Sequence, residues 1–158
     1  MKFFKYADYG MRVNNVFSKL CSELKIILPM ARIEHIGSSS VEGAISKGDL
    51  DIFVGVSKDE FNDSLDKIKS IGFTEKLDTF RADYLCMLVC DRYDLDMAIQ
   101  LVENGSETEN FIHFRERLRN DPGLLSEYND LKTLSAGLSE IEYRSRKAIF
   151  IAQVLESG

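Results

Sequence analysis

The chain has 158 residues, of which 44% are hydrophobic, and it carries a formal net charge of −6. This size is typical of one domain with an ordinary core, and the acidic balance argues against a protein that binds nucleic acid by neutralising many phosphates. No apolar run approaches the roughly 20 residues of a membrane span and the first residues lack the apolar core of a signal peptide, so we expect a cytoplasmic protein without a membrane partner.

The first third of the chain predicts a helix and two strands that are joined by a turn of small residues. Apolar residues recur with helical spacing over residues 9–28, and Pro29 follows them. Residues 31–36 indicate a short strand that leads into Gly37-Ser38-Ser39-Ser40. Ser40 can cap a short helix to about residue 46, and residues 49–56 then form a second strand.

The rest of the chain predicts a second sheet portion followed by helices. We expect a helix over residues 59–71, then strands over 84–90 and 93–102 with a tight hairpin turn at Asp91-Arg92. Helical patterns cover residues 107–120, 122–135 and 140–155, with Pro122 suited to the first turn of its helix. The expected fold class is α+β: a small mixed β-sheet backed by helices, forming one domain with an α/β core over about residues 1–104 and a helical portion over about 105–158.

The cysteines indicate reduced thiols. Cys21, Cys86 and Cys90 are odd in number and match no metal-binding spacing. Free cysteine is among the most buried residue types, so we expect all three to be buried and unpaired.

Two pairs of aspartates are candidates for binding a cation. Asp49 and Asp51 lie two residues apart in a predicted strand, so both project from one face, where they repel each other unless a cation neutralises them. Mg²⁺ commonly takes one or two protein carboxylates and completes its shell with water and substrate phosphate.

A second pair, Asp94 and Asp96, belongs to a later predicted strand. If that strand pairs beside the first, one of its aspartates completes a three-carboxylate cluster able to hold two metal ions. We favour Asp96, which directly precedes an apolar run as Asp51 does; Asp94 is the alternative.

The small-residue turn is a candidate for binding phosphate. Gly37 permits a backbone geometry that other residues resist, and the hydroxyls of Ser38 and Ser39 with nearby N–H groups can form an anion-binding nest. A Gly-Ser turn and a pair of strand carboxylates are each common in proteins. Together, in this order, they favour nucleotide chemistry.

The motifs resemble those of a known superfamily. Gly37-Ser38, an Asp-x-Asp strand and a third Asp on a later strand are similar to the signature of the nucleotidyltransferases that include DNA polymerase beta. A narrower set resembles the GrpB-like family of that superfamily: HIGSSSVEG at residues 35–43, FRERLR at 114–119 followed by Pro122, EYNDLK at 127–132, and Tyr143 with Lys147. The resemblance implies a mixed sheet backed by helices and a Mg²⁺-dependent transfer of a nucleoside monophosphate from a nucleoside triphosphate to an acceptor.

This chain departs from the GrpB-like pattern at two places. Asp49 stands where an apolar residue is usual, and Asp94-Leu95-Asp96 stands where His-x-His is usual. Both changes move the site toward the carboxylate triad of active nucleotidyltransferases. The resemblance also implies that Lys147, one helical turn from Tyr143, faces the site and contacts the triphosphate, although a solvated surface lysine is the alternative.

Four more basic residues have a functional and a structural interpretation. Arg115 and Arg119 share a helical face and suit phosphate contacts, but ion pairing with nearby acids is slightly favoured. His35 lies next to the turn, where a simple hydrogen bond is favoured over a phosphate contact. Lys47 is either a phosphate ligand or an exposed loop cation.

The leading hypothesis is therefore a nucleotidyltransferase that uses ATP or another nucleoside triphosphate. Asp49 and Asp51 bind one or two Mg²⁺, Gly37, Ser38, Ser39 and Lys147 hold the nucleotide, and Asp96 shares the metal and deprotonates or orients the acceptor hydroxyl. The acceptor is a small molecule or a macromolecule, with nucleic acid disfavoured by the acidic balance. The alternatives are a non-catalytic nucleotide-binding or sensing module, and a toxin-type nucleotidyltransferase that modifies a protein or an RNA end.

Overall fold

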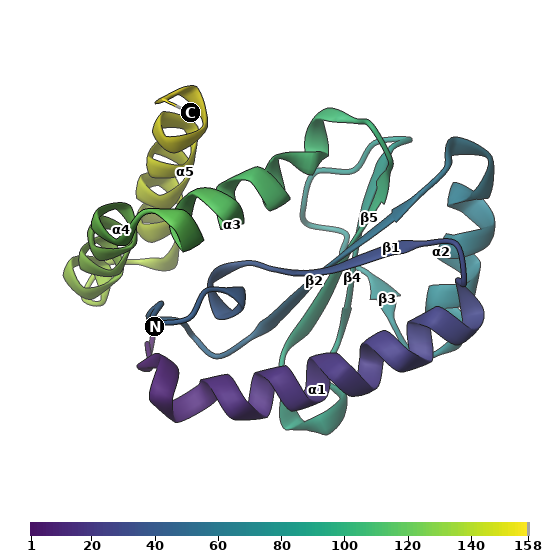
Figure 1. Cartoon of the computed structure of the whole chain (residues 1–158), viewed down its shortest axis with the longest axis horizontal. Coiled ribbons are helices and arrows are strands. Elements are labelled where there is room, and N and C mark those ends of the chain that lie inside the picture. Colours follow the sequence, from purple (N-terminus) through teal and green to yellow (C-terminus); the bar gives the residue numbers. More distant parts are fainter. Residues whose placement is uncertain (158) are drawn as a thin grey trace.

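A computed structural model, described over residues 1–157, contains one five-stranded mixed sheet (Figure 1). The strand order is β1 (Arg32–Ile36), β2 (Leu50–Val56), β5 (Met97–Glu103), β4 (Leu85–Cys90) and β3 (Thr74–Glu75). The β2 and β5 strands are parallel, and the other neighbours are antiparallel. The structure confirms the predicted α+β class and mixed sheet.

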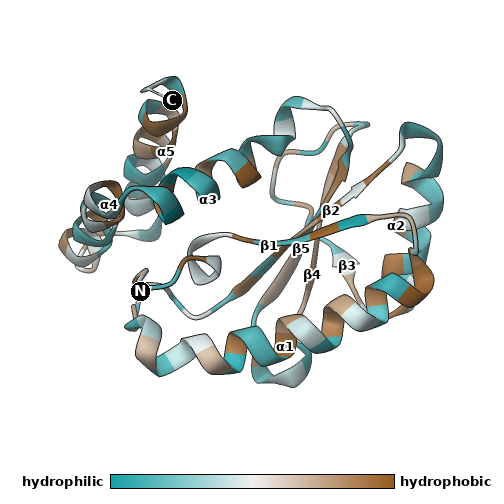
Figure 2. Cartoon of the chain, viewed as in Figure 1, coloured by the Kyte–Doolittle hydropathy of each residue, from teal (hydrophilic) through white to brown (hydrophobic). Residues whose placement is uncertain are grey.

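Two helices cover one face of this sheet. Helix α1 (Tyr6–Ile27) runs across it and α2 (Phe61–Ser70) packs beside it. Buried side chains of α1, among them Leu20 and Leu24, pack with Ile52 of β2 and Ile99 of β5 in the largest hydrophobic cluster. Figure 2 shows that hydrophobic residues dominate the inner strands. Along α1, hydrophobic residues alternate with polar ones, as expected of an amphipathic helix.

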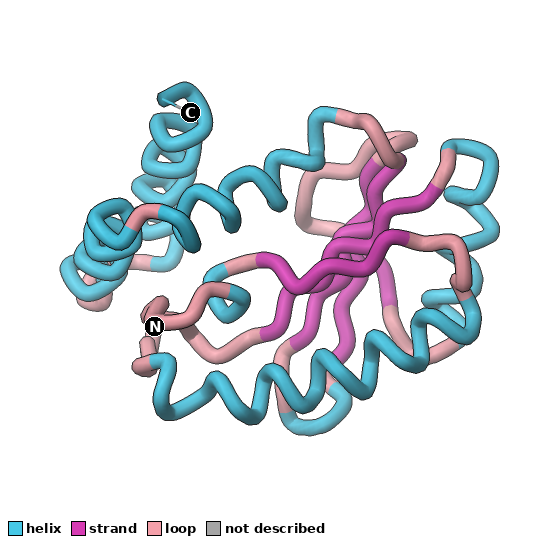
Figure 3. The backbone as a smooth tube through the Cα atoms, viewed as in Figure 1, coloured by secondary structure: helices cyan, strands magenta, loops and turns pink. Residues whose placement is uncertain are grey.

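The C-terminal helices lie toward the other face and beyond one end of the sheet (Figure 3). Helix α3 (Asn110–Asn120) is followed by α4 (Pro122–Ser135) and α5 (Glu140–Ser157). Phe53 of β2 and Ile112 of α3 belong to a small cluster between the sheet and α3. Another cluster, centred on Tyr128 of α4, joins these helices to residues 41–44. The helices therefore pack against the segment that follows the small-residue turn.

The predicted helix over residues 40–46 is not present. A single 3-10 turn, η1 (Ser38–Ser40), follows Gly37, and Ser46 forms an isolated bridge with Phe4. Gly43 and Gly48 have φ values of 89° and 83°, which no helix contains. The segment is an irregular loop whose backbone groups bond to the N-terminal segment and to α4.

The strand predicted over residues 93–102 begins later, at Met97. A short 3-10 segment, η3 (Arg92–Asp94), precedes it, and both Tyr93 and Asp94 have positive φ values, of 70° and 52°. The connection from β4 is therefore longer than the predicted two-residue turn. The two-residue strand β3 was not predicted, because so short a segment has no recognisable pattern.

Two further predictions can be compared with the structure. Cys21, Cys86 and Cys90 are all free thiols, of which only Cys86 is fully buried. Among the described residues, no helix has the length and apolar character needed to cross a membrane.

Candidate functional site

The small-residue turn and the first aspartate pair touch each other. Antiparallel pairing of β1 with β2 sets Ile36 opposite Asp51, so Gly37 follows directly beside that carboxylate. Gly37 has φ 75° and ψ −179°, a combination nearly confined to glycine. A β-carbon at Gly37 would lie only 2.5 Å from Oδ2 of Asp51. Glycine is thus required both by the backbone and by the space that the carboxylate occupies.

The other predicted carboxylates lie on the same edge of the sheet. Leu50 and Ile52 are fully buried against α1, so Asp49 and Asp51 project from the opposite face, as the alternation predicted. The parallel register pairs Leu50 with Met97, and the Leu50 N–H donates to the Asp96 carbonyl at 2.9 Å. Asp96 therefore neighbours Asp49 across the two strands.

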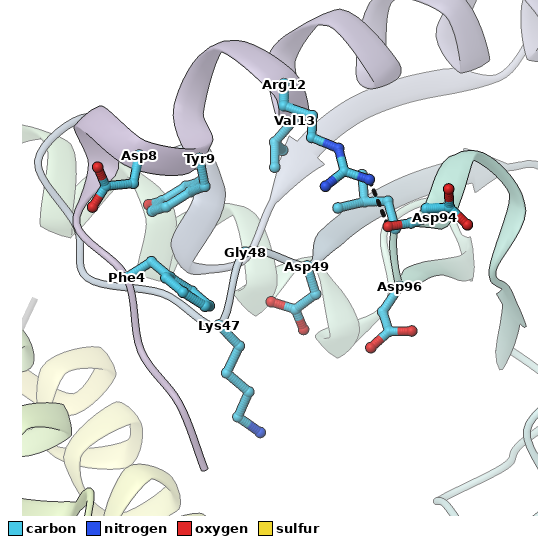
Figure 4. A pocket seen from close by; sticks show the side chains of 11 residues that line it. Phe4, Asp8, Tyr9, Arg12, Val13, Lys47, Gly48, Asp49, Asp94 and Asp96 are labelled. Carbon is cyan, nitrogen blue, oxygen red and sulfur yellow. Dashed lines mark hydrogen bonds between the residues drawn. The ribbon is translucent and has the colours of Figure 1, made fainter.

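Two cavities open at this edge. One, of about 620 Å³, is lined by Asp49, Asp51 and Asp96 together with residues of β4 and Arg144 of α5. A second cavity, of about 450 Å³, lies between the start of α1 and the loops that precede β2 and β5. Figure 4 shows the carboxylates of Asp49 and Asp96 pointing into the same space of this second cavity, with Lys47 nearby, while the Asp94 carboxylate points away. The geometry thus sets Asp96 rather than Asp94 next to Asp49.

The electrostatics of the edge favour a bound cation. Burial, followed by the negative charge of Asp49, raises the pKa of Asp51 to about 7, and Lys147, Lys132 and Lys47 oppose the increase. A carboxylate with a raised pKa is held in an unfavourable ionised state at neutral pH. A divalent cation at this edge would relieve that cost.

The donor set fits Mg²⁺ in its chemistry. Carboxylate oxygens are the ligands that Mg²⁺ prefers, and this ion usually takes only one or two of them from protein. Within residues 1–157 no three His, Cys, Asp or Glu side chains are gathered as a ready-made metal cluster. The site therefore fits an ion that completes its shell with water and substrate phosphate, as opposed to one enclosed by protein ligands.

The two serines of the turn face different surroundings. The Ser38 hydroxyl donates to Ser46 Oγ at 3.0 Å, and Ser46 Oγ accepts from the Gly48 N–H at 3.1 Å, which links the turn to the start of β2. Ser39 is 1% exposed, and its Oγ lies 3.0 Å from Nε2 of His35. The structure brings Ser38 to the carboxylate edge and turns the Ser39 hydroxyl away from it.

His35 is a buried, neutral residue. Its ring stacks on Phe17 of α1 at a centroid distance of 5.0 Å. Burial, followed by the charges of Arg119 and Arg115, lowers the pKa of His35 to about 4. The favoured prediction, a simple hydrogen bond, is confirmed by its contact with Ser39.

Three lysines surround Asp51, and one of them was not singled out from the sequence. Lys147 is half-buried and lines a cavity of about 280 Å³ together with Gly37 and Asp51. Lys47 extends from the loop before β2, with its Nζ 5.6 Å from the ring centre of Tyr143. Lys132 of α4 is 1% exposed, donates to the Ile45 carbonyl, and has its pKa lowered to about 6 by burial and then by Lys147. The EYNDLK motif contained this residue, but a lysine in a polar helical stretch gives no indication of burial.

Arg115 and Arg119 of α3 both make structural contacts. Arg115, which is 7% exposed, donates to Glu34 at 2.9 Å and to the His35 carbonyl at 2.9 Å. Arg119 donates to the Ser40 carbonyl through two nitrogens, at 2.7 and 3.2 Å. Both bind α3 to β1 and the turn, and for Arg115 the favoured ion pairing is confirmed.

Sequence comparison connects the chain to a family of bacterial proteins. A family model described as "GrpB protein" matches residues 5–157. A UPF0157 protein of Vibrio cholerae is 45% identical over 155 residues, which cover 98% of this chain and 82% of the relative. A UPF0157 protein of Deinococcus radiodurans is 26% identical over 136 residues, covering 84% and 70%.

Solved structures share the fold. The crystal structure of the conserved protein GrpB from Enterococcus faecalis has a TM-score of 0.79 at 23% identity, covering 99% of this chain and 96% of that one. The Cid1 poly(U) polymerase with MgGTP bound has a TM-score of 0.52 at 18% identity, covering 74% of this chain and 39% of that one. The chain therefore shares its fold with GrpB over nearly its whole length and with the Cid1 polymerase over about three quarters of it.

Proposed function

The chain belongs to the GrpB family, and from that premise we propose that it is a Mg²⁺-dependent nucleotidyltransferase that moves a nucleoside monophosphate from a nucleoside triphosphate to a hydroxyl of an acceptor. The observation that carries the proposal is the contact between Gly37 and Asp51, because it joins a backbone turn suited to phosphate to a carboxylate suited to metal. The fold that the chain shares with the MgGTP-bound Cid1 poly(U) polymerase also supports it.

Asp49, Asp51 and Asp96 would hold Mg²⁺ by closing on the ion when it binds, because the metal-free side chains of residues 1–157 form no ready-made cluster of three ligands. When bound, this ion neutralises charge on the phosphates and on the aspartates and makes the α-phosphorus easier to attack. The raised pKa of Asp51 supports this role, since the carboxylates are costly to ionise together without a counterion.

The turn and the lysines would hold the triphosphate. Gly37 lets the backbone approach a phosphate closely beside Asp51, and the next residue, the partly exposed Ser38, offers a hydroxyl that donates to Ser46 in the metal-free protein. Ser39 contributes through the backbone of the turn, since its hydroxyl contacts His35. Lys147, which shares a cavity with Gly37 and Asp51, supplies positive charge to the phosphates.

The reaction needs one proton acceptor. The acceptor oxygen forms a bond to the α-phosphorus, the bond from that phosphorus to the bridging oxygen of the β-phosphate breaks, and pyrophosphate leaves. Asp96 takes the proton of the attacking hydroxyl, because it is the exposed carboxylate of the set and opens to both cavities.

The test has a binding arm and a turnover arm. Calorimetry with non-hydrolysable nucleoside triphosphates should show binding that requires Mg²⁺ and is lost in Asp51→Asn, a variant of nearly the same shape. Pyrophosphate release should then appear when the protein, Mg²⁺ and a nucleoside triphosphate are mixed with pooled small-molecule and protein acceptors. Full turnover by Asp51→Ala would overturn the proposal. Mg²⁺-dependent binding without turnover on any acceptor would instead favour the non-catalytic nucleotide-binding module.

A further inference from the structure

The turn that leads to Asp96 has an unfavourable backbone conformation. Tyr93 and Asp94 are consecutive residues with φ values of 70° and 52°, in the left-handed region that residues with side chains adopt rarely, although aspartate enters it more readily than tyrosine. A residue in this conformation persists only where its surroundings impose it. Asp96 follows two residues later, so the path of this turn determines where its carboxylate lies.

Helix α1 contacts this turn at three places along one face. Arg12 donates through Nη2 to the carbonyls of Tyr93, at 3.0 Å, and Asp94, at 2.6 Å. The Lys19 ammonium lies 5.6 Å from the ring centre of Tyr93. Glu23 accepts two bonds from Arg92, at 2.8 and 3.3 Å. Of these contacts, only that of Arg12 engages the backbone of both left-handed residues.

Arg12 also lines the cavity into which Asp49 and Asp96 point (Figure 4). Its guanidinium is directed at the two carbonyls of the turn. Below the turn, Leu95 is buried in the core between the sheet and α1. The Asp96 carbonyl accepts from the Leu50 N–H of β2. Asp96 is thus fixed by β2 on one side and, through the turn, by α1 on the other.

We propose that Arg12 is a positioning residue: it holds Tyr93 and Asp94 in their left-handed conformation and thereby sets Asp96 beside Asp49 at the metal edge. This inference rests on the proposed function, in which Asp96 is a metal ligand. Without Arg12 the turn relaxes toward ordinary backbone angles, and Asp96 moves with it.

Two explanations of Arg12 predict opposite effects on cation binding. If Arg12 acted only through its charge, removing it from a cavity that holds a cation would tighten cation binding. If it positions Asp96, removing it weakens binding, because a ligand is displaced. Loss of residues that orient metal ligands typically costs 10- to 100-fold in metal affinity.

The experiment measures Mn²⁺, as a probe for Mg²⁺, by electron paramagnetic resonance with a non-hydrolysable nucleoside triphosphate present. Arg12→Gln should weaken Mn²⁺ binding about tenfold, and Arg12→Lys, which keeps the charge and can reach one carbonyl, should weaken it less. Lys19→Gln removes one positive charge from the same helix face without touching the turn backbone, so it should leave Mn²⁺ affinity within about twofold. Unchanged or tighter Mn²⁺ binding by Arg12→Gln would overturn the inference.

Amide hydrogen exchange gives a readout that needs no metal. The Leu50 N–H reports directly on Asp96, because it donates to the Asp96 carbonyl. In metal-free Arg12→Gln this amide should exchange about tenfold faster than in the unmodified protein, while Lys19→Gln should match the unmodified protein. Equal protection of Leu50 in Arg12→Gln would show that Arg12 does not position this segment.

An Asp96→Asn variant distinguishes a failure of the inference about Arg12 from a failure of the proposed function. If Asp96→Asn weakens Mn²⁺ binding but Arg12→Gln does not, the role of Arg12 is refuted and the proposed function stands. If Asp49→Asn weakens Mn²⁺ binding and Asp96→Asn does not, Asp96 is no metal ligand and the inference falls with that part of the proposal. If no variant and no unmodified protein binds Mn²⁺, both are refuted.

Discussion

Replacing Gly37 with alanine should disrupt the contact on which the proposed site depends. The backbone angles of Gly37, φ 75° and ψ −179°, cost an alanine about 1–3 kcal/mol. Its methyl carbon would also lie 2.5 Å from Oδ2 and 3.0 Å from the β-carbon of Asp51, so the carboxylate must move. We expect the free energy of unfolding to fall by about 2–4 kcal/mol and Mn²⁺ affinity to fall by about tenfold or more.

Gly43→Ala is the matched control. Gly43 also has a positive φ, of 89°, but the nearest atom to an added β-carbon is Cδ2 of Leu125 at 3.5 Å, an ordinary contact. This variant should lose about 1 kcal/mol of stability and keep its Mn²⁺ affinity. Urea denaturation followed by circular dichroism measures the first quantity, and electron paramagnetic resonance titration measures the second. If Gly37→Ala and Gly43→Ala behaved alike in both, the contact between the turn and Asp51 would have no role in the site.

Three further predictions concern stability, each measured by urea denaturation. Burial lowers the pKa of His35 from an ordinary 6.5 to about 4, so the contribution of the neutral His35 ring to stability is fully present above pH 6.5 and decreases below it. The free energy of unfolding should therefore drop by about 2 kcal/mol between pH 7.5 and pH 5. This part of the drop should be absent in His35→Gln. Burial and Asp49 raise the pKa of Asp51 from 3.8 to about 7, so the unmodified protein loses stability as the pH rises through this range and Asp51 must ionise. Metal-free Asp51→Asn should therefore be up to about 4 kcal/mol more stable than the unmodified protein at pH 8 and equal to it near pH 4. Asn129 accepts from the Ile45 N–H at 2.8 Å and donates to the Gly43 carbonyl at 3.0 Å, so Asn129→Ala should cost about 1–3 kcal/mol.

Each of these predictions has an outcome that contradicts it. The same pH dependence in His35→Gln and in the unmodified protein would show that His35 is not the titrating group. An Asp51→Asn variant that is less stable at pH 8 would mean that Asp51 already has a favourable partner in the metal-free protein. An Asn129→Ala variant of unchanged stability would mean that water replaces both of its bonds.

The sequence predicted the carboxylate edge well, because side chains alternate along a strand whatever surrounds it. Asp49 and Asp51 could therefore be assigned to the face opposite Leu50 and Ile52, which are buried. Whether the two aspartate-bearing segments pair was left as a condition in the sequence analysis, and the parallel register of β2 and β5 shows that they do.

The irregular segments were predicted poorly, since their conformation depends on partners far away in the sequence. The loop after η1 is held by Phe4 and by Asn129, and neither partner is visible from residues 40–46 alone. Tyr93 and Asp94 adopt left-handed angles although neither is glycine, and Arg12, which binds their carbonyls, lies more than 80 residues earlier in the sequence. Local composition cannot reveal such contacts.

The orientation of single side chains was likewise beyond the sequence. Ser38 and Ser39 are chemically identical neighbours, yet one contacts Ser46 near the carboxylates and the other contacts the buried His35. Lys132 is a fully buried lysine, although lysine is a residue type that is mostly exposed. In each case tertiary packing, and not residue type, determines the role that the side chain can have.

The most direct test of nucleotidyl transfer compares two positions of the radioactive label in the same nucleoside triphosphate. With Mg²⁺ and pooled acceptors, label at the α-phosphate should appear in a new adduct and label at the γ-phosphate should appear only in pyrophosphate, and both signals should disappear in Asp51→Asn. Transfer of the γ-label to an acceptor, or an α-label adduct that forms equally well in Asp51→Asn, would contradict the account.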